Sequence, residues 1–234
     1  MMRQFTTIAG KKARVQYTSS LYVDKFEKTV GAHFVKPAAS VLVLNGNIGK
    51  PQNIQTYHFI RHCSQIWKDI LYVPGTYEID GDDYRNKTDS MKQVYKSLPN
   101  VHVLYNSTKY ISYIDTLFLG TINDKEWLRN KFTEKNEIHK KHTKFVALTH
   151  FTPDISMIHP VDKKYNISIN YDIYPPVNAW LCGYNRGAHT HTYRNGVICA
   201  YNARGPIDGK NDFSERLGWS RSAYLDIPDT IIED

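Results

Sequence analysis

The sequence predicts an α/β fold, and two observations predict it. Residues 41–44 form the apolar run Val-Leu-Val-Leu, which stops abruptly in Asn-Gly-Asn-Ile-Gly at 45–49. Such a run is too short for a buried helix and is typical of a central strand covered on both faces. A helical pattern capped by Asn53 follows, so strand, turn and helix come in the order of a βα unit. Because α/β proteins bind ligands at the carboxyl ends of such strands, we expect any chemistry at 45–49.

Length and composition favour one domain over residues 1–234. The hydrophobic share is 41% and the charged share 23%, which is ordinary for a globular protein. No long apolar run is present, so we expect no membrane span, and Met1–Phe5 lacks the apolar core of a signal peptide. Cys63, Cys182 and Cys199 lie in apolar segments and are odd in number, which favours buried thiols in the cytoplasm or another reducing intracellular compartment.

The net charge of +7 permits an acidic partner such as nucleic acid. The basic cluster of an expected helix over 124–142 consists of Lys131, Lys135, Lys140, Lys141 and Lys144. A solvated helix face is the commoner explanation of such a cluster, and a phosphate contact is the alternative.

Before the central strand, residues 13–17 alternate like a strand and run into a serine turn that ends at Tyr22. After it, a helix is expected from Asn53 to about Asp69. Its apolar stripe is Phe59, Cys63, Ile66, Trp67 and Ile70. Residues 70–73 are the next expected strand, and it ends in Pro-Gly-Thr-Tyr-Glu at 74–78.

The second half continues the alternation of helices and strands. A helix is expected over 88–98, strands over 101–104 and 111–119 with a polar turn at 106–108, and the charged helix over 124–142. The buried side of that helix is expected to be Trp127, Leu128, Phe132 and Ile138. A strand over 144–149 runs into His150, residues 156–176 read as a loop, and strands end at Gly183 and at 201 before Asn-Ala-Arg-Gly at 202–205.

Five of these segments, in this order, resemble the motifs of the calcineurin-like metallophosphoesterase family. The motifs of that family are, in chain order, a strand followed by Ser-Asp-Leu-His, then Gly-Asp-Ile-Gly, Pro-Gly-Asn-His-Glu, Thr-His-His-x-Pro and Trp-x-x-Gly-His-Thr-His. The last of these is followed by Asn-Pro-Arg-Gly. The resemblance covers about residues 14–206 and implies a four-layer α/β/β/α sandwich of two mixed sheets. It also implies that strands ending at Thr18, Leu44, Val73, Thr149 and Gly183 converge at one end of the sandwich.

This sequence departs from the family at nearly every metal-binding position. The family's ligand and general-acid positions are held here by Ser20, Tyr22, Asn47, Thr76, Tyr77, Tyr184 and Arg186, and only His150 is kept. Two metal ions need carboxylate and imidazole ligands, and a histidine general acid is replaced by Tyr77. We therefore expect no catalytic residues, no metal and no cofactor: a pseudoenzyme that serves as an interaction or structural protein with a protein partner.

Two alternatives stay open. One is a phosphoesterase with a rebuilt site in which His150, Glu78, His189 and His191 hold one divalent Zn, Mn or Fe ion, although His189 and His191 are expected in a hairpin loop beyond the family's histidines. The other is a phosphate or nucleic-acid binder that uses Arg186, Asn47 and His150, with Arg186 pairing with Glu78 or holding a phosphate. The bias toward Lys, Asn, Ile and Tyr suits an AT-rich genome such as that of a large DNA virus or a protist, so a virion location is a further expectation.

Overall fold

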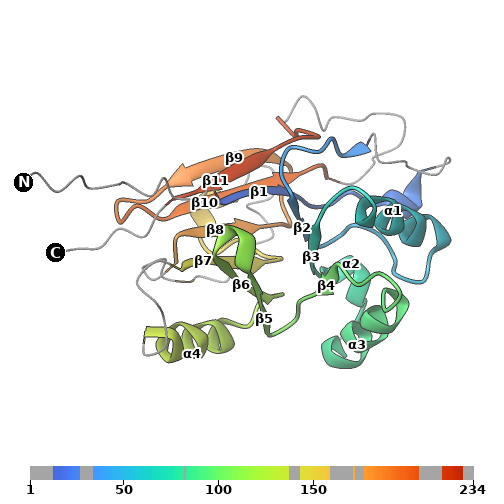
Figure 1. The fold of residues 1–234 in the computed structure, drawn as a ribbon, viewed down its shortest axis with the longest axis horizontal. Helices are drawn as coiled ribbons and strands as arrows, with labels where there is room; N and C mark the ends of the chain where they lie inside the picture. The colour runs from blue at the N-terminus through green and yellow to red at the C-terminus, as the bar shows by residue number, and fades with distance from the viewer. Residues whose placement is uncertain are drawn as a thin grey trace, which may run out of the picture.

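Two mixed β-sheets pack face to face, with helices on the outside (Figure 1). The computed structural model describes residues 13–26, 34–81, 83–136, 143–158, 171, 177–205 and 218–228. The first sheet has the order β11 (Tyr224–Ile227), β1 (Ala13–Thr18), β2 (Val41–Asn45), β3 (Asp69–Val73) and β4 (Val101–Val103). Strands β1 to β4 run parallel and β11 runs antiparallel to β1.

The second sheet has six strands in the described part of the chain. Their order is β5 (Ser107–Ile111), β6 (Thr116–Thr121), β7 (Lys144–Thr149), β8 (Ala179–Cys182), β10 (Ile198–Ala203) and β9 (Gly187–Thr192). The helices are α1 (Ile54–Ser64), α2 (Thr76–Ile79), α3 (Tyr84–Val94) and α4 (Lys125–Asn136), with 3-10 turns η1 (Val23–Lys25), η3 (Ser112–Ile114) and η4 (Ile155–Met157).

The alternation of side chains along β2 divides the core into layers. Val41 and Val43 pack between the two sheets, while Leu42 and Leu44 face the opposite way, toward α1 and α3. A third cluster lies between the second sheet and α4, where Leu128 is buried. Two faces of β2 are therefore covered, as the unbroken apolar run predicts. The predicted four-layer α/β/β/α sandwich is confirmed.

The helix after β2 is shorter than predicted. Asn53 caps it by accepting a hydrogen bond from the N–H of Gln55 (2.8 Å), but it ends at Ser64 instead of near Asp69. Strand β3 pairs Asp69 with Val41, so the chain must turn before that residue. Asn100 fixes this turn by donating to the carbonyl of Ser64 (2.8 Å). The parallel pairing of β3 with β2 therefore ends the helix earlier than its apolar pattern predicts.

The strand predicted over 111–119 is instead a hairpin. Strand β5 begins at Ser107, inside the predicted polar turn, and pairs antiparallel with β6 from Ser107 opposite Gly120 to Ile111 opposite Thr116. The turn lies at η3 and ends at Asp115, which has a left-handed backbone (φ 45°). Similarly, α3 begins at Tyr84 because Asp83 caps it, four residues earlier than predicted.

Lys144 does not belong to the basic helix face. It lies in β7, is buried, and donates to the carbonyl of Ile227 (3.1 Å). The side chains of Lys135, Lys140 and Lys141, as well as Ile138, fall outside the described residues, as does most of the predicted loop over 156–176. No helix in the described ranges is long and apolar enough to cross a membrane.

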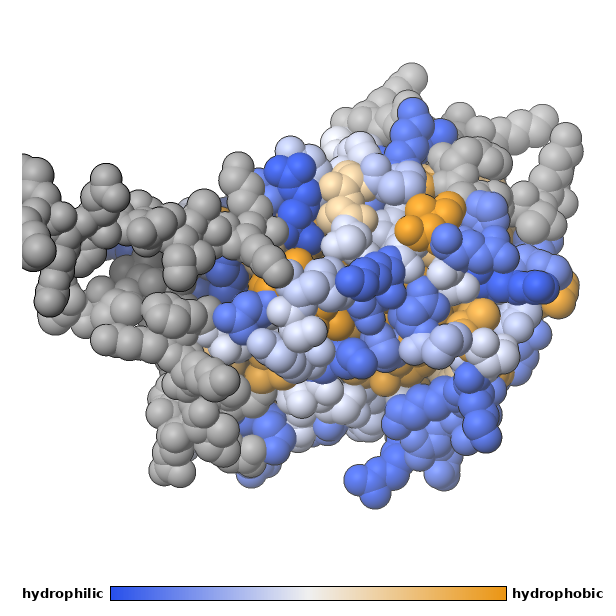
Figure 2. Space-filling view, in the orientation of Figure 1, coloured by the Kyte–Doolittle hydropathy of each residue, from blue (hydrophilic) through white to orange (hydrophobic). Residues whose placement is uncertain are grey.

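The three cysteines are buried free thiols, as predicted. On the face that Figure 2 shows, hydrophilic residues dominate and the hydrophobic ones form small separate patches.

Candidate functional site

The carboxyl ends of the parallel strands of both sheets meet at one end of the sandwich. The N–H of Ser20, just after β1, donates to the carbonyl of Gly46, just after β2 (2.9 Å). From the second sheet, the N–H of Gly183 donates to the carbonyl of His150 (3.0 Å), and His150 Nδ1 lies 3.3 Å from the carbonyl oxygen of Asn45. The predicted convergence of the strand ends is confirmed.

A buried carboxylate, Glu78 in α2, organises the turn after β2. Its oxygens accept hydrogen bonds from the N–H groups of Asn47 (2.8 Å), Ile48, Gly49 (3.3 Å) and Gly75 (2.8 Å) and from the Tyr72 hydroxyl (2.9 Å). Burial raises the pKa of Glu78, and the hydrogen bonds from Asn47, Gly75, Ile48 and Tyr72 counteract part of that rise. Successive N–H groups that surround a carboxylate form an anion nest. Here the anion is part of the chain itself.

Asn47 holds the position at which the resemblance implies a bridging carboxylate. It is only 2% exposed, and both ends of its amide are engaged. The Oδ1 atom accepts from the N–H of Tyr77 (2.9 Å), and the Nδ2 group donates to the Tyr22 hydroxyl (3.0 Å). A neutral side chain therefore ties together three of the degenerate positions.

Tyr22 and Tyr77 form an aromatic pair beside this amide. Their rings meet edge to face with centroids 5.0 Å apart, and the Tyr77 hydroxyl donates to Asp24 (2.8 Å). The ammonium group of Lys50 lies 4.8 Å from the centroid of the Tyr77 ring. Burial, with a smaller contribution from Glu78, raises the pKa of Tyr22 to about 12, so its hydroxyl keeps its proton at neutral pH.

His150 is fully buried between the sheets and neutral. Burial lowers its pKa to about 4. With Nδ1 donating to the Asn45 carbonyl, the lone pair is on Nε2, which lies 3.5 Å from the Thr76 hydroxyl. The rings of Phe151 and Tyr184 pack against the imidazole with centroids 5.0 and 5.1 Å away. This imidazole is oriented as a metal ligand would be, but aromatic rings surround it.

Four residues of the converging loops have left-handed backbones. They are Ser20 (φ 54°), Tyr22 (φ 49°), Asn47 (φ 56°) and Tyr184 (φ 49°). For residues other than glycine this conformation costs roughly 1–2 kcal/mol each, and such strain clusters at functional sites. All four occupy positions that the resemblance assigns to metal ligands.

Arg186 is half-buried at the start of β9, and its charge lowers the pKa of Tyr22 slightly. The expectation that it pairs with Glu78 is wrong, because no ion pair joins these two described residues. The Glu78 oxygens are already used by five donors of the chain. Arg186 therefore lies near the site without neutralising its carboxylate.

His189 and His191 are in strand β9 and not in a hairpin loop, because they pair with Tyr201 and Cys199 of β10. Both side chains are exposed, whereas His150 and Glu78 are buried. In the described ranges no three His, Cys, Asp or Glu side chains lie close enough to share one metal ion. The four residues of the alternative metal site are thus not brought together.

Sequence reasoning missed several polar residues of this end of the sandwich. Tyr72 and Asp24 anchor Glu78 and Tyr77 but belong to no motif. Ser19 lies just after β1 and Asn45 at the end of β2. The Ser19 hydroxyl and both amide atoms of Asn45 are buried without a hydrogen-bond partner among the described residues. Asn45 lies in the predicted segment 45–49 and Ser19 in the predicted serine turn, so their positions were predicted, whereas their burial without partners was not.

Comparisons with known proteins agree with this fold. No family profile matches the chain. An uncharacterized protein of Acanthamoeba polyphaga mimivirus is 26% identical over 249 residues, which covers 82% of this chain and 86% of that protein. The phosphopantetheinyl hydrolase PptH from Mycobacterium tuberculosis superposes with a TM-score of 0.65 at 11% identity and covers 92% of this chain and 96% of its own.

A dimetal phosphatase from Danio rerio gives a TM-score of 0.47 at 8% identity, with coverage of 82% of this chain and 87% of its own. The likeness to PptH agrees with the predicted α/β fold of two packed sheets, and the chain has a viral relative.

Proposed function

We propose that this protein is a non-catalytic relative of the metallophosphoesterases that acts as an interaction or structural protein. The observation that supports this most is the arrangement of Asn47. Both ends of its amide are used by Tyr77 and Tyr22, so the position of the expected metal bridge is part of an internal hydrogen-bond network. A neutral amide also lacks the charge with which a carboxylate holds two cations.

The neighbouring side chains support the same proposal. Ser20, Tyr22, Thr76, Tyr184 and Arg186 supply neither carboxylate nor imidazole. Tyr22 offers a phenol in place of a carboxylate or imidazole, and its hydroxyl already accepts a hydrogen bond from Asn47. His150 is the one expected ligand that is kept, and it is packed between Phe151 and Tyr184. Hydrogen bonds and ring contacts hold these side chains together in place of metal ions.

Glu78 argues against a rebuilt site and against phosphate binding by the turn at 46–49. Its carboxylate already occupies the N–H groups of Asn47, Ile48 and Gly49, which would otherwise attract an anion. Binding of an external phosphate would then depend on Arg186. If Arg186 binds phosphate, added phosphate should raise the Tm of the native protein but leave the Tm of Arg186→Ala unchanged.

Metal content and hydrolysis test the main proposal. The protein, purified and incubated with Mn²⁺ or Fe²⁺ and then freed of unbound ions, should retain no stoichiometric metal. In the presence of Mn²⁺, Zn²⁺ or Fe²⁺ it should hydrolyse no generic phosphodiester above background. Two bound ions per chain that are lost in His150→Ala would contradict it.

Restoring the carboxylate is the sharper experiment. Asn47→Asp places a second carboxylate beside Glu78 in a buried site, so stability should fall by roughly 1–3 kcal/mol. Because the surrounding residues are not ligands, Mn²⁺ should not restore the stability. Recovery of the native Tm in Mn²⁺, but not in EDTA, would mean that a functional metal site persists.

The mimivirus relative supports a viral setting, with a virion component as one version of it. Mass spectrometry of purified mimivirus particles should then detect that relative at the level of structural proteins. Its presence only in infected-cell lysate would place the interaction role outside the particle.

A further inference from the structure

Strand β9 is the outermost strand of the second sheet (Figure 1). It pairs with β10 on one side, and residues 188–192 are exposed. An edge strand presents unpaired N–H and C=O groups, which natural proteins protect with lysine, proline, charge or short length. The other edges follow that rule: β4 has three residues, β5 carries Lys109 and β11 carries Asp226. Strand β9, with the sequence Gly-Ala-His-Thr-His-Thr, has none of these devices.

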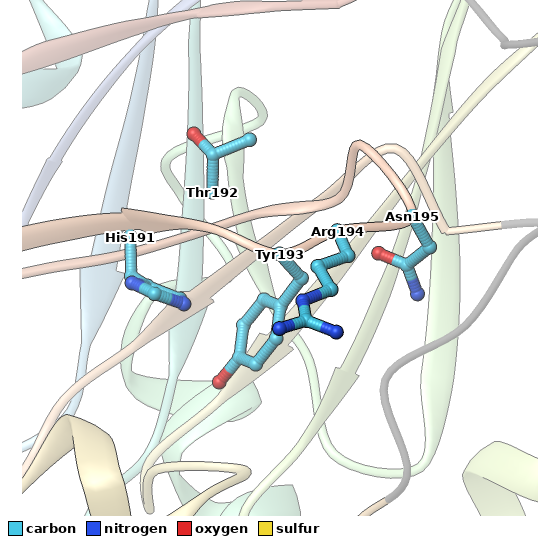
Figure 3. Close-up of a pocket in the computed structure, with 5 residues that line it drawn as sticks. All are labelled: His191, Thr192, Tyr193, Arg194 and Asn195. Carbon is cyan, nitrogen blue, oxygen red and sulfur yellow. The ribbon is translucent and has the colours of Figure 1, made fainter.

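His189 and His191 project from the same face of this edge. Their rings are nearly parallel, with an interplanar angle of 14° and centroids 6.5 Å apart. The ring of Tyr193 supports His191 at 4.6 Å, and Figure 3 shows both on one side of the strand with Thr192 on the other. Two exposed imidazoles on one face of a strand can supply two ligands to a metal that prefers nitrogen, once their rings rotate toward it.

The sequence of β9 is self-complementary in an antiparallel pair. Around Thr190 it reads His-Thr-His in both directions, with the small residues Ala188 and Thr192 outside. Pairing two copies about Thr190 places each His189 opposite the His191 of the second copy. Directly opposed residues have Cβ atoms about 5 Å apart. Four imidazoles then share one face of the joined strands.

We propose that two copies of this protein pair antiparallel along β9 and that one zinc ion, bound by the four imidazoles of the two His189 and two His191 residues, holds the pair together. Zinc is most often four-coordinate and tetrahedral in structural sites, and the described residues of one chain supply two ligands here. No third His, Cys, Asp or Glu in the described part of the chain lies close enough to complete the site. The second copy completes it and also pairs the edge of β9 that no other strand of the described part of the chain covers.

The mass of the full chain in solution tests this proposal. In EDTA or Mg²⁺ the protein should be a monomer of 27.1 kDa, and in Zn²⁺ its mass measured by light scattering should double, with half a zinc ion bound per chain. The double variant His189→Ala with His191→Ala should stay monomeric in zinc. The matched control is His58→Ala with His62→Ala, an exposed pair at i, i+4 spacing on α1, and it should still dimerise.

Charges at Thr190 test the strand pairing separately from zinc binding. Because Thr190 meets its own copy at the twofold axis, Thr190→Lys and Thr190→Asp should each abolish the dimer through like-charge repulsion. An equimolar mixture of the two variants should dimerise again in zinc, which shows that both are folded. A native protein that stays monomeric in zinc, a dimer that survives loss of both histidines, or dimers of Thr190→Lys alone would each overturn the proposal.

Discussion

At Glu78, one side chain connects two turns that the sequence separates by about 30 residues. Its carboxylate accepts from the turn after β2 and from Gly75 after β3, so it holds the ends of two parallel strands together. Four of its five donors are backbone N–H groups, which remain when neighbouring side chains are substituted, and the fifth is the Tyr72 hydroxyl. Its role is therefore structural, and the sequence could not distinguish this role from that of a metal ligand.

Replacing this carboxylate should be costly. Glu78→Gln keeps the shape but turns an amide group toward N–H donors, so we expect a loss of about 3 kcal/mol in the free energy of unfolding, because hydrogen bonds to a buried charge are lost and donors are left unpaired. Urea denaturation measures this. Asp80→Asn is the control, since that carboxylate is largely exposed beside Lys50 and its removal should leave the midpoint unchanged. Equal effects of the two substitutions would contradict the role of Glu78.

His150 should make stability depend on pH. Its folded pKa of about 4 lies below the model-peptide value of 6.5, so between these pH values the unfolded chain binds a proton that the folded chain does not. Above pH 6.5 both states are neutral and the effect vanishes. From pH 6.5 down to 4, this difference of about 2.5 units should remove about 3 kcal/mol of stability.

His150→Gln should flatten that part of the stability profile, measured by urea denaturation at pH 7.5 and 4.5. The exposed His58→Gln is the control and should keep the native slope. An unchanged slope in His150→Gln would mean that other groups cause the acid sensitivity.

Among the elements, the two sheets come close together at Gly183, after β8. A Cβ atom added there would lie 2.1 Å from the backbone oxygen of Asn45, at the end of β2. Since backbone cannot rotate away as a side chain can, Gly183→Ala should push the two strand ends apart. We expect a loss of stability of more than about 2 kcal/mol, as for other overpacked interiors.

Gly81→Ala is the control for Gly183→Ala. Gly81 has a positive φ of 104° but nothing within 4 Å of an added Cβ, so its substitution tests backbone strain alone. Thermal denaturation of both variants should show the larger drop in Tm for Gly183→Ala. A larger drop in Tm for Gly81→Ala would mean that the two sheets can move apart at Gly183 at little cost in stability.

The elements that the sequence predicted correctly are those whose pattern has one physical cause. The apolar run of β2 and the strands β1, β3 and β7 follow from burial, and their ends mark the site. The misses depend on pairing and capping contacts that an apolar pattern does not encode. The end of α1 is set by the pairing of β3 with β2, and the β5–β6 hairpin is set by its own register. The positions of the site residues were predictable, whereas their hydrogen-bond partners were not.

On the scale of the whole molecule, the two sheets are joined as well as stacked. Ser19, just after β1, forms a bridge to Ala203 of β10, and the N–H of Arg204 donates to the Ser19 carbonyl (3.1 Å). Asn202 adds a side-chain link by donating to the carbonyl of Tyr17 (3.1 Å). The segment that resembles the family's Asn-Pro-Arg-Gly motif thus connects the sheets.

These links predict that the chain unfolds as one cooperative unit, as the expected single domain over residues 1–234 requires. Each sheet buries one face against the other, so neither keeps a complete core when its partner unfolds. Urea transitions followed by far-UV circular dichroism and by tryptophan fluorescence should therefore coincide. Trp67 and Trp219 report on the core beside the first sheet and Trp180 on the core beside the second, so single-tryptophan variants test each half. Separate midpoints for Trp67 and Trp180 would divide the chain into two independently stable halves and would contradict the joining role of Ser19 and Asn202.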